Sequence, residues 1–132
     1  MIIIFNGPPG SGKDEAASYF KQRGFKHVSF KYVLFKETIK YFKVSRDWFM
    51  QNYNDRQIKE RPEKALQGFS RREALIHVSE EVIKPVEGLD FFGRCVANEI
   101  EQGKDYAISD GGFIEELTPI INKIGTGNIV LV

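Results

Sequence analysis

Cysteine is nearly absent from this sequence: Cys95 is the single one in 132 residues. One cysteine cannot close an internal disulfide, so a small disulfide-stapled secreted scaffold is excluded. Long apolar runs are absent as well, because the stretch from Met1 to Phe5 is far too short for a signal peptide or a membrane-spanning helix. We therefore expect a cytoplasmic protein that has no membrane partner.

Neither sign of charge is in excess, because 19 Lys and Arg residues stand against 18 Asp and Glu residues. A strongly basic surface for a nucleic acid polymer is not expected, and any anion-binding site must be local. What the sequence does have is an apolar fraction of 42%, with 11 phenylalanines, which is enough for an ordinary core. We expect residues 1–132 to form a single domain.

Short apolar runs alternate with helical patterns along the chain. The β-branched run at 2–5 is typical of a strand buried on both faces of a parallel sheet. Further strands are expected at 27–30, 106–109 and 128–132. Helices are expected at about 12–23, 33–42, 70–84, 91–100 and 114–121. This alternation predicts an α/β fold with a short parallel sheet of about four strands.

The central region differs from this pattern. The sequence is polar and aromatic from Arg46 to Phe69, with breaker pairs at Arg61-Pro62 and Gly68-Phe69. We expect residues 31–88 to form a mobile excursion from the sheet. Within it, Ser70 and the glutamate three positions later form a capping-box pattern, which predicts a helix start there and a helix end at Pro85, followed by a turn.

The sequence from Gly7 to Lys13 matches the Walker A pattern and lies between a predicted strand and a predicted helix, as that motif requires. Glycines allow backbone N–H groups to turn around phosphate oxygens, and the helix N-terminus adds the positive end of its dipole. Lys13 supplies a charge between the β- and γ-phosphates. We predict an ATP site in the loop and the first helical turn, formed by Gly7, Pro8, Pro9, Gly10, Ser11, Gly12, Lys13, Asp14 and Glu15.

Two aspartates are candidate Mg²⁺ ligands. Asp14 stands where Walker A loops normally carry the Ser or Thr that coordinates the metal, and its carboxylate is also a hard oxygen ligand, acting directly or through water. Asp110 follows the strand at 106–109, and ligands of open α/β sheets bind beyond the carboxyl ends of strands. The alternative for Asp110 is a structural one, in which it caps a helix that begins near Gly112.

Basic and aromatic residues are candidates for holding a phosphate acceptor. Arg72 is predicted to be catalytic, together with Lys13 and Asp110, because it lies in the first turn of the helix after the excursion. The alternative is a surface arginine paired with an acidic residue. Phe91 is a candidate for stacking on an acceptor base, although aromatic residues at helical spacing belong to the core more often. The predicted acceptor-binding set is Lys31, Lys36, Arg72, Phe91 and Asp110.

Several blocks together resemble the deoxynucleoside monophosphate kinases of the bacteriophage type, within the wider P-loop nucleoside monophosphate kinase family. The P-loop variant from Ser11 to Asp14 recurs in that group and in the similar phosphomevalonate kinases. The looser blocks are Ser29-Phe30 with Leu34, Lys36 and Glu37, then Val44 to Trp48, Ser70 to Leu75, Asp90 to Phe92 and Ile108 to Phe113. They occur in the same order as in the family, from Met1 to about Glu116.

The resemblance implies a P-loop NTPase-like fold of three layers, α/β/α. It also implies an enzyme that uses ATP and Mg²⁺ and transfers the γ-phosphoryl group in line to a (deoxy)nucleoside monophosphate. The acceptor would lie between the region from Lys31 to Arg72 and Asp110, and the location would be the host cytoplasm if a bacteriophage encodes the protein. Two alternatives remain: a P-loop kinase for another phosphorylated metabolite, and an ATP-binding module without efficient turnover.

The last apolar run, from Ile129 to Val132, predicts a strand that is buried on both faces and has an open edge, which favours pairing with a second copy. A homodimer is therefore a further expectation. In the kinases that the sequence resembles, the matching strand leads into a lid that carries arginines, and no such segment follows here. We expect either a form truncated before the lid or a form that uses arginines from elsewhere in the chain.

Overall fold

The computed structural model describes residues 1–6, 12–51, 53–111 and 114–132. The chain forms two compact units. Unit 1 comprises Met1–Val33 and Leu89–Val132, and unit 2 comprises Leu34–Gly88. Unit 2 therefore covers nearly the same residues as the predicted excursion.

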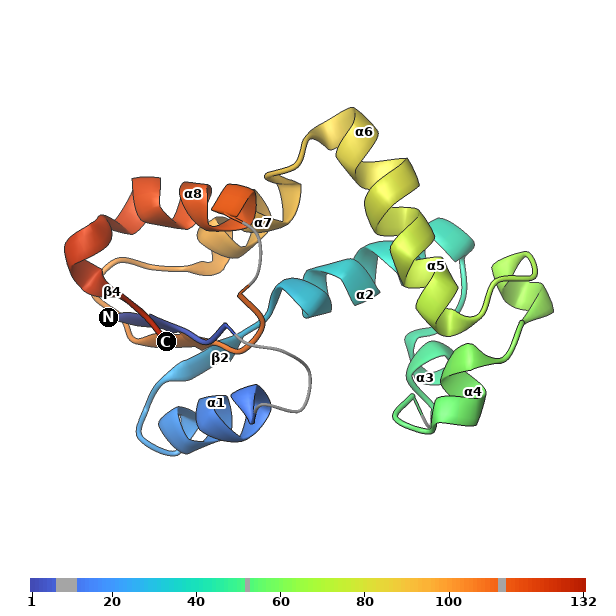
Figure 1. Cartoon of the computed structure of the whole chain (residues 1–132), viewed down its shortest axis with the longest axis horizontal. Coiled ribbons are helices and arrows are strands. Elements are labelled where there is room, and N and C mark those ends of the chain that lie inside the picture. Colours follow the sequence, from blue (N-terminus) through green and yellow to red (C-terminus); the bar gives the residue numbers. More distant parts are fainter. Residues whose placement is uncertain (7–11, 52, 112–113) are drawn as a thin grey trace. The chain divides into compact units, whose positions relative to one another are not determined.

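A parallel sheet of four strands forms the centre of unit 1, in the order β2-β3-β1-β4 (Figure 1). Its strands are β1 (Ile2–Ile4), β2 (Lys26–Val28), β3 (Tyr106–Ile108) and β4 (Ile129–Leu131). Ile3 pairs with Ala107 on one side and with Val130 on the other, which makes β1 an interior strand. The predicted α/β class and the four predicted strands are confirmed, although each strand is shorter than expected.

The strand β4 differs from its prediction in burial. Val130 and Leu131 are 43% and 60% exposed, so the expectation of a strand buried on both faces is wrong. The reason is its place in the sheet: β4 pairs with β1, and the described residues place no strand on its other side. The apolar run therefore forms an edge strand.

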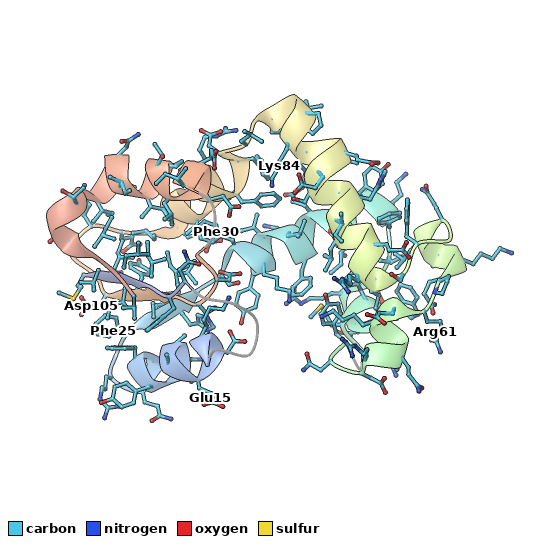
Figure 2. The ribbon with its side chains drawn as sticks, viewed as in Figure 1. Glu15, Phe25, Phe30, Arg61, Lys84 and Asp105 are labelled. Atoms are coloured by element: carbon cyan, nitrogen blue, oxygen red, sulfur yellow. The ribbon has the colours of Figure 1, made fainter. Side chains whose placement is uncertain are left out.

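Helices lie on both faces of the sheet in unit 1. In Figure 1, α1 (Lys13–Lys21) lies on one side, and α7 (Phe91–Glu99) and α8 (Ile114–Ile124) lie on the other. A buried cluster joins α1 to the sheet and contains Ile3, Phe5, Ala17 and Ala107. Phe25, labelled in Figure 2, packs against this cluster. A short 3₁₀ helix, η3 (Thr126–Asn128), leads into β4. These elements match the predicted helices at 12–23, 91–100 and 114–121.

The helix α2 (Phe30–Phe42) begins in unit 1 and continues into unit 2. The prediction that the second strand extends to residue 30 is therefore wrong, because the strand β2 ends at Val28 and Phe30 already starts the helix. Hydrogen bonds that the first backbone N–H groups of α2 donate to the Asp110 carboxylate account for this early start.

The regular secondary structure among the described residues of unit 2 is all helical. Besides α2 it contains α3 (Arg46–Met50), α4 (Arg56–Glu60), the 3₁₀ helix η1 (Lys64–Leu66), α5 (Arg71–His77), the π-helical segment η2 (Val78–Ile83) and α6 (Lys84–Glu87). Phe49 and Leu66 are fully buried and contribute to its core.

The predicted capping box at the start of α5 is confirmed. Ser70 Oγ accepts from the Glu73 N–H (3.1 Å), and Glu73 Oε1 accepts from the Ser70 N–H (3.1 Å). The predicted helix end at Pro85 is wrong, because α5 passes through η2 into α6 and the helix ends at Glu87. Pro85 lies in the first turn of α6, where the N–H that proline lacks is not needed, and the wider turn before it changes the hydrogen-bonding pattern.

Among the described residues, no helix combines the length and the apolar character that a crossing of the bilayer requires.

Candidate functional site

The carboxyl ends of β1, β3 and β4 meet at one edge of the sheet, where backbone pairing continues beyond the strands. Phe5 N–H donates to the Ile108 carbonyl (2.8 Å), and Gly111 N–H donates to the Phe5 carbonyl (3.1 Å). Asn6 N–H donates to the Val132 carbonyl (3.0 Å). Ligands of parallel α/β sheets bind at this edge, which makes it the candidate site. The predicted loop residues outside the described ranges are Gly7, Pro8, Pro9, Gly10 and Ser11.

The start of α1 completes the described part of the predicted phosphate loop. Gly12 has a φ of 86°, in the left-handed region that favours glycine, and α1 begins with the next residue, Lys13. The backbone carbonyl of Gly12 accepts a hydrogen bond from the Ala16 N–H (3.0 Å), as the carbonyl of the residue before a helix normally does. Asp14 and Glu15 are exposed in the first turn, and Figure 2 labels Glu15 there. Three of the predicted nucleotide-binding residues, Lys13, Asp14 and Glu15, therefore lie together at the positive end of a helix dipole.

Asp110 caps a helix, but a different helix from the one named in the alternative above. Its Oδ2 accepts from Ser29 Oγ (2.7 Å) and from the Lys31 N–H (2.9 Å), and its Oδ1 accepts from the Phe30 N–H (3.0 Å). The carboxylate thus holds the first turn of α2. The position is close-packed, because a methyl group on the neighbouring Gly111 would overlap the Ile4 side chain.

A second polar contact crosses the same strands and was not predicted from the sequence. His27 Nε2 lies 2.8 Å from Ser109 Oγ, and the His27 ring contacts the ring of Tyr32 edge to face. His27 is the middle residue of β2 and Ser109 directly follows β3, and these two strands are hydrogen-bonded neighbours. Only the strand order brings them together, and the sequence does not state that order.

The predicted acceptor-binding residues divide between the units. Lys31, Phe91 and Asp110 lie in unit 1, whereas Lys36 and Arg72 lie in unit 2. The Phe91 ring packs edge to face against the neighbouring Phe92, and the guanidinium of Arg94 lies 5.8 Å from its centre. Within unit 1, the structure joins the Lys31 backbone to Asp110.

Arg72 is exposed and forms an ion pair. Its Nη1 lies 3.4 Å from Glu60 Oε1, which is the surface pairing weighed above as the alternative to a catalytic role. Arg72 also acts on a buried phenol: burial raises the pKa of Tyr53 above its ordinary value, and the positive charge of Arg72 partly opposes that rise. The Tyr53 hydroxyl is therefore protonated at neutral pH.

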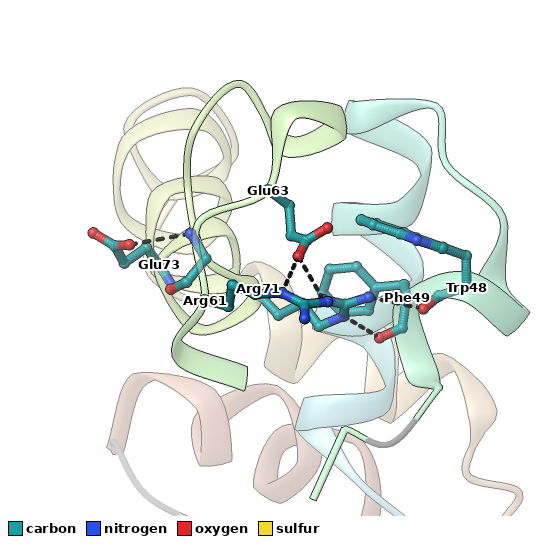
Figure 3. Close-up of polar contacts among 7 residues, drawn as sticks. Trp48, Phe49, Arg61, Glu63, Arg71 and Glu73 are labelled. Carbon is teal, nitrogen blue, oxygen red and sulfur yellow. Dashed lines mark hydrogen bonds and ion pairs between the residues drawn. The ribbon is translucent and has the colours of Figure 1, made fainter. Parts of the chain in front are cut away.

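Arg71 was one of several basic candidates from which Arg72 was singled out, and it is the buried one of these two neighbouring arginines. It is 2% exposed, and it donates from Nε to the Phe49 carbonyl (2.9 Å) and from Nη2 to the Trp48 carbonyl (3.1 Å). Its guanidinium lies 4.3 Å from the centre of the Trp48 ring, and its Nη1 lies 3.8 Å from Glu63 Oε1 (Figure 3). The Arg61 Nε donates to the same Glu63 oxygen (2.7 Å). Arg71 thereby ties α5 to the end of α3.

The two candidate Mg²⁺ ligands are in different environments. The exposed carboxylate of Asp14 in the first turn of α1 suits a hard cation that keeps several of its waters. Both oxygens of Asp110 already accept hydrogen bonds from the α2 turn. The described residues contain no cluster of three or more His, Cys, Asp or Glu side chains arranged to hold a metal. The site therefore fits Mg²⁺ better through Asp14 than through Asp110.

Comparison with known proteins gave no match: no protein-family model, no curated protein and no solved structure is similar to this chain.

Proposed function

We propose that this chain is a nucleoside monophosphate kinase, which transfers the γ-phosphoryl group of ATP in line to a (deoxy)nucleoside monophosphate in the cytoplasm. One observation carries the proposal. The Walker A sequence connects the interior strand β1 to α1, and its described end has a left-handed Gly12 (φ 86°) directly before Lys13. Strand, glycine-rich sequence, lysine and helix follow one another along the chain in the order that supports phosphate binding.

The chain's own residues have distinct tasks in this proposal. Backbone N–H groups of the loop and the N-terminus of α1 hold the β- and γ-phosphates, and the Lys13 ammonium neutralises the charge between them. Asp14 holds the metal, directly or through water. Mg²⁺, when bound, would supply positive charge that offsets the charge of the phosphates. Catalysis then consists of positioning and charge neutralisation, because phosphoryl transfer needs little covalent chemistry from the protein.

The acceptor side is proposed to use the members of the predicted set in unit 1, which are Lys31, Phe91 and Asp110, whereas Lys36 and Arg72 lie in unit 2. Lys31 is the member best supported, because it begins α2 at the carboxyl edge of the sheet and its backbone is fixed by Asp110. The pairing of Arg72 with Glu60 favours the second candidate function, an ATP-binding module without efficient turnover, since a catalytic Arg72 would have to leave that partner. A third candidate is a P-loop kinase for another phosphorylated metabolite.

The experiment that separates these candidates is a panel of acceptors. Purified protein is incubated with ATP and Mg²⁺ alone and then with each deoxynucleoside and ribonucleoside monophosphate, and ADP and the acceptor diphosphates are quantified by chromatography. The proposal expects ADP and one or more nucleoside diphosphates in equal amounts. ATP binding without ADP would support the module, and ADP formed only with other phosphorylated metabolites would support the third candidate. Failure to bind ATP would contradict all three.

A further inference from the structure

Asp110 connects the end of one strand to the helix that follows another strand. Its carboxylate accepts three hydrogen bonds of 2.7 to 3.0 Å, all from the three consecutive residues Ser29, Phe30 and Lys31. Ser29 adds a local cap, because its Oγ accepts from the Lys31 N–H (3.1 Å). Ser29 is 4% exposed, so little water competes for these bonds. The start of α2 is thus fixed both by its own serine and by a carboxylate from β3.

We infer that Asp110 is a positioning residue for the acceptor side of the site and not a direct metal ligand. It holds the first turn of α2, and Lys31 with it, at the carboxyl edge of the sheet. The part of this inference that concerns the acceptor rests on the proposed function. The part that concerns the helix start does not.

The charges around Asp110 favour the role of positioning residue over that of metal ligand. Three donor hydrogens point at its oxygens, so positive partial charge surrounds the carboxylate on the side of α2. The three donors take three of the roughly four acceptor sites of a carboxylate, so a Mg²⁺ ion could use only the remaining site on Oδ1, close to the positive ends of the donors. Asp14, in the exposed first turn of α1, meets the metal requirement of the proposed reaction without breaking a helix cap.

The same geometry limits how the acceptor can bind. The N-terminus of a helix attracts phosphate through its free N–H groups, but here the Asp110 carboxylate occupies the N–H groups of Phe30 and Lys31. The phosphate of the acceptor cannot use them while Asp110 is in place. The proposal therefore gives side chains the larger part in holding this phosphate, among them Lys31, whose backbone Asp110 fixes.

Two variants and a matched control test the inference. Asp110→Asn keeps the shape of the side chain but replaces one acceptor oxygen with a donor, and Ser29→Ala removes the hydroxyl that joins the cap. Asp105→Asn is the control, because Asp105 lies next to the other end of β3 and forms an exposed ion pair with the N-terminal amine. Amide hydrogen exchange is measured without nucleotide, and KM values for ATP and acceptor and the Mg²⁺ dependence of ATP binding are measured for each protein.

In Asp110→Asn, exchange at the amides of residues 30 and 31 should accelerate by roughly tenfold or more, as the loss of a charge-assisted bond implies. Ser29→Ala should show a smaller acceleration at the same amides. Both should raise the KM for the acceptor and leave the Mg²⁺ midpoint of ATP binding within about twofold, because the metal is held elsewhere. Asp105→Asn should change none of these quantities.

Two results would overturn the inference. Unchanged exchange at residues 30 and 31 in Asp110→Asn would show that the carboxylate does not hold the helix start. A Mg²⁺ requirement raised about tenfold in Asp110→Asn but unchanged in Ser29→Ala would assign the carboxylate to the metal. If Asp110→Asn does not fold, the exchange and KM results of Ser29→Ala decide in its place. A wild-type protein that does not phosphorylate monophosphates would contradict the proposed function, whereas the exchange result would still decide the cap.

Discussion

Arg71 and Arg72 are neighbours in the sequence and have opposite environments. Arg71 is buried against Trp48 and the end of α3, and Arg72 is exposed beside Glu60. The helical spacing contains this information: residues 71, 74, 75 and 78 follow the i, i+3, i+4, i+7 pattern, and all four are buried. Reading the phase of α5, instead of the proximity of each arginine to the capping box, would have identified Arg71 as the inward-facing one.

This difference predicts unequal effects on stability. Arg71→Ala should lower the free energy of unfolding by about 2 to 4 kcal/mol. The reason is that the carbonyls of Trp48 and Phe49 and the carboxylate of Glu63 all lose the buried guanidinium as a partner. Arg72→Ala should change the free energy of unfolding by less than about 0.5 kcal/mol, because an exposed ion pair contributes little. Urea denaturation of both variants measures the two values. Equal losses would contradict the assignment of Arg71 as the structural arginine.

A second prediction concerns Asp14 as the proposed ligand of Mg²⁺. Asp14→Ser restores the hydroxyl that Walker A loops normally use for the metal, so Mg²⁺-dependent nucleotide binding should be retained. The midpoint of a Mg²⁺ titration in the presence of ATP should stay within about tenfold of the wild-type value. Glu99→Gln is the control, because it removes an exposed acidic charge on α7 of the same unit, outside the predicted ATP site. Complete loss of metal dependence in the serine variant would refute the equivalence of the two ligands.

At the scale of elements, the sequence predicts what local pattern and capping determine. The strands β1 to β4, the helices α1, α7 and α8, and the capping box of α5 all follow from periodicity and end signals. The errors occur where a distant residue or an unusual turn decides the outcome. The α2 start depends on Asp110, which is distant in sequence, and the helix passes Pro85 because of the π-helical segment η2. The pattern of neighbouring residues in the sequence reveals neither the contact with Asp110 nor the π-helical segment.

The contact between α7 and α8 gives a prediction for one glycine. Gly93 is buried, and a methyl group there would overlap the backbone of Glu116. Gly93→Ala should therefore force the two helices apart and lower the free energy of unfolding by about 1 to 3 kcal/mol. Gly127→Ala is the control, because Gly127 has open space around the position of a methyl group. Thermal unfolding of both variants checks this, and an equally stable Gly93 variant would contradict the packing of α7 on α8.

At the scale of the whole molecule, the α/β class and the parallel sheet could be predicted, and the strand order could not. The order β2-β3-β1-β4 brings Asp110 to the Ser29 turn and His27 to Ser109, and these pairings depend on it. The sequence therefore could not predict the hydrogen bonds around Asp110 and His27, and the ATP site expected at the sheet edge stays a prediction. The specific kinase function stays a prediction, since it rests on the Walker A sequence and on a resemblance.

The edge strand gives a prediction about assembly. Val130 and Leu131 are exposed on β4, and an exposed apolar edge favours pairing with another chain. Sedimentation velocity should show association that increases with protein concentration, and Leu131→Lys should weaken it because a charge on the edge opposes pairing. Asn122→Lys, an exposed position on α8, adds the same charge elsewhere and serves as control. A wild-type protein that stays monomeric at all concentrations would contradict the homodimer proposal.

Lys13 is proposed to neutralise phosphate charge during transfer of the γ-phosphoryl group of ATP. The most direct measurement follows label from ATP radioactive at the γ-position into a nucleoside diphosphate, for the wild type, Lys13→Ala and Lys21→Ala. Lys21 is the matched control, because it is an exposed lysine in the last turn of the same helix. The account predicts that label transfer is lost in Lys13→Ala alone, while the melting temperature without nucleotide is unchanged in all three. Transfer by Lys13→Ala within about tenfold of the wild type, or ~1.4 kcal/mol of barrier, would contradict it.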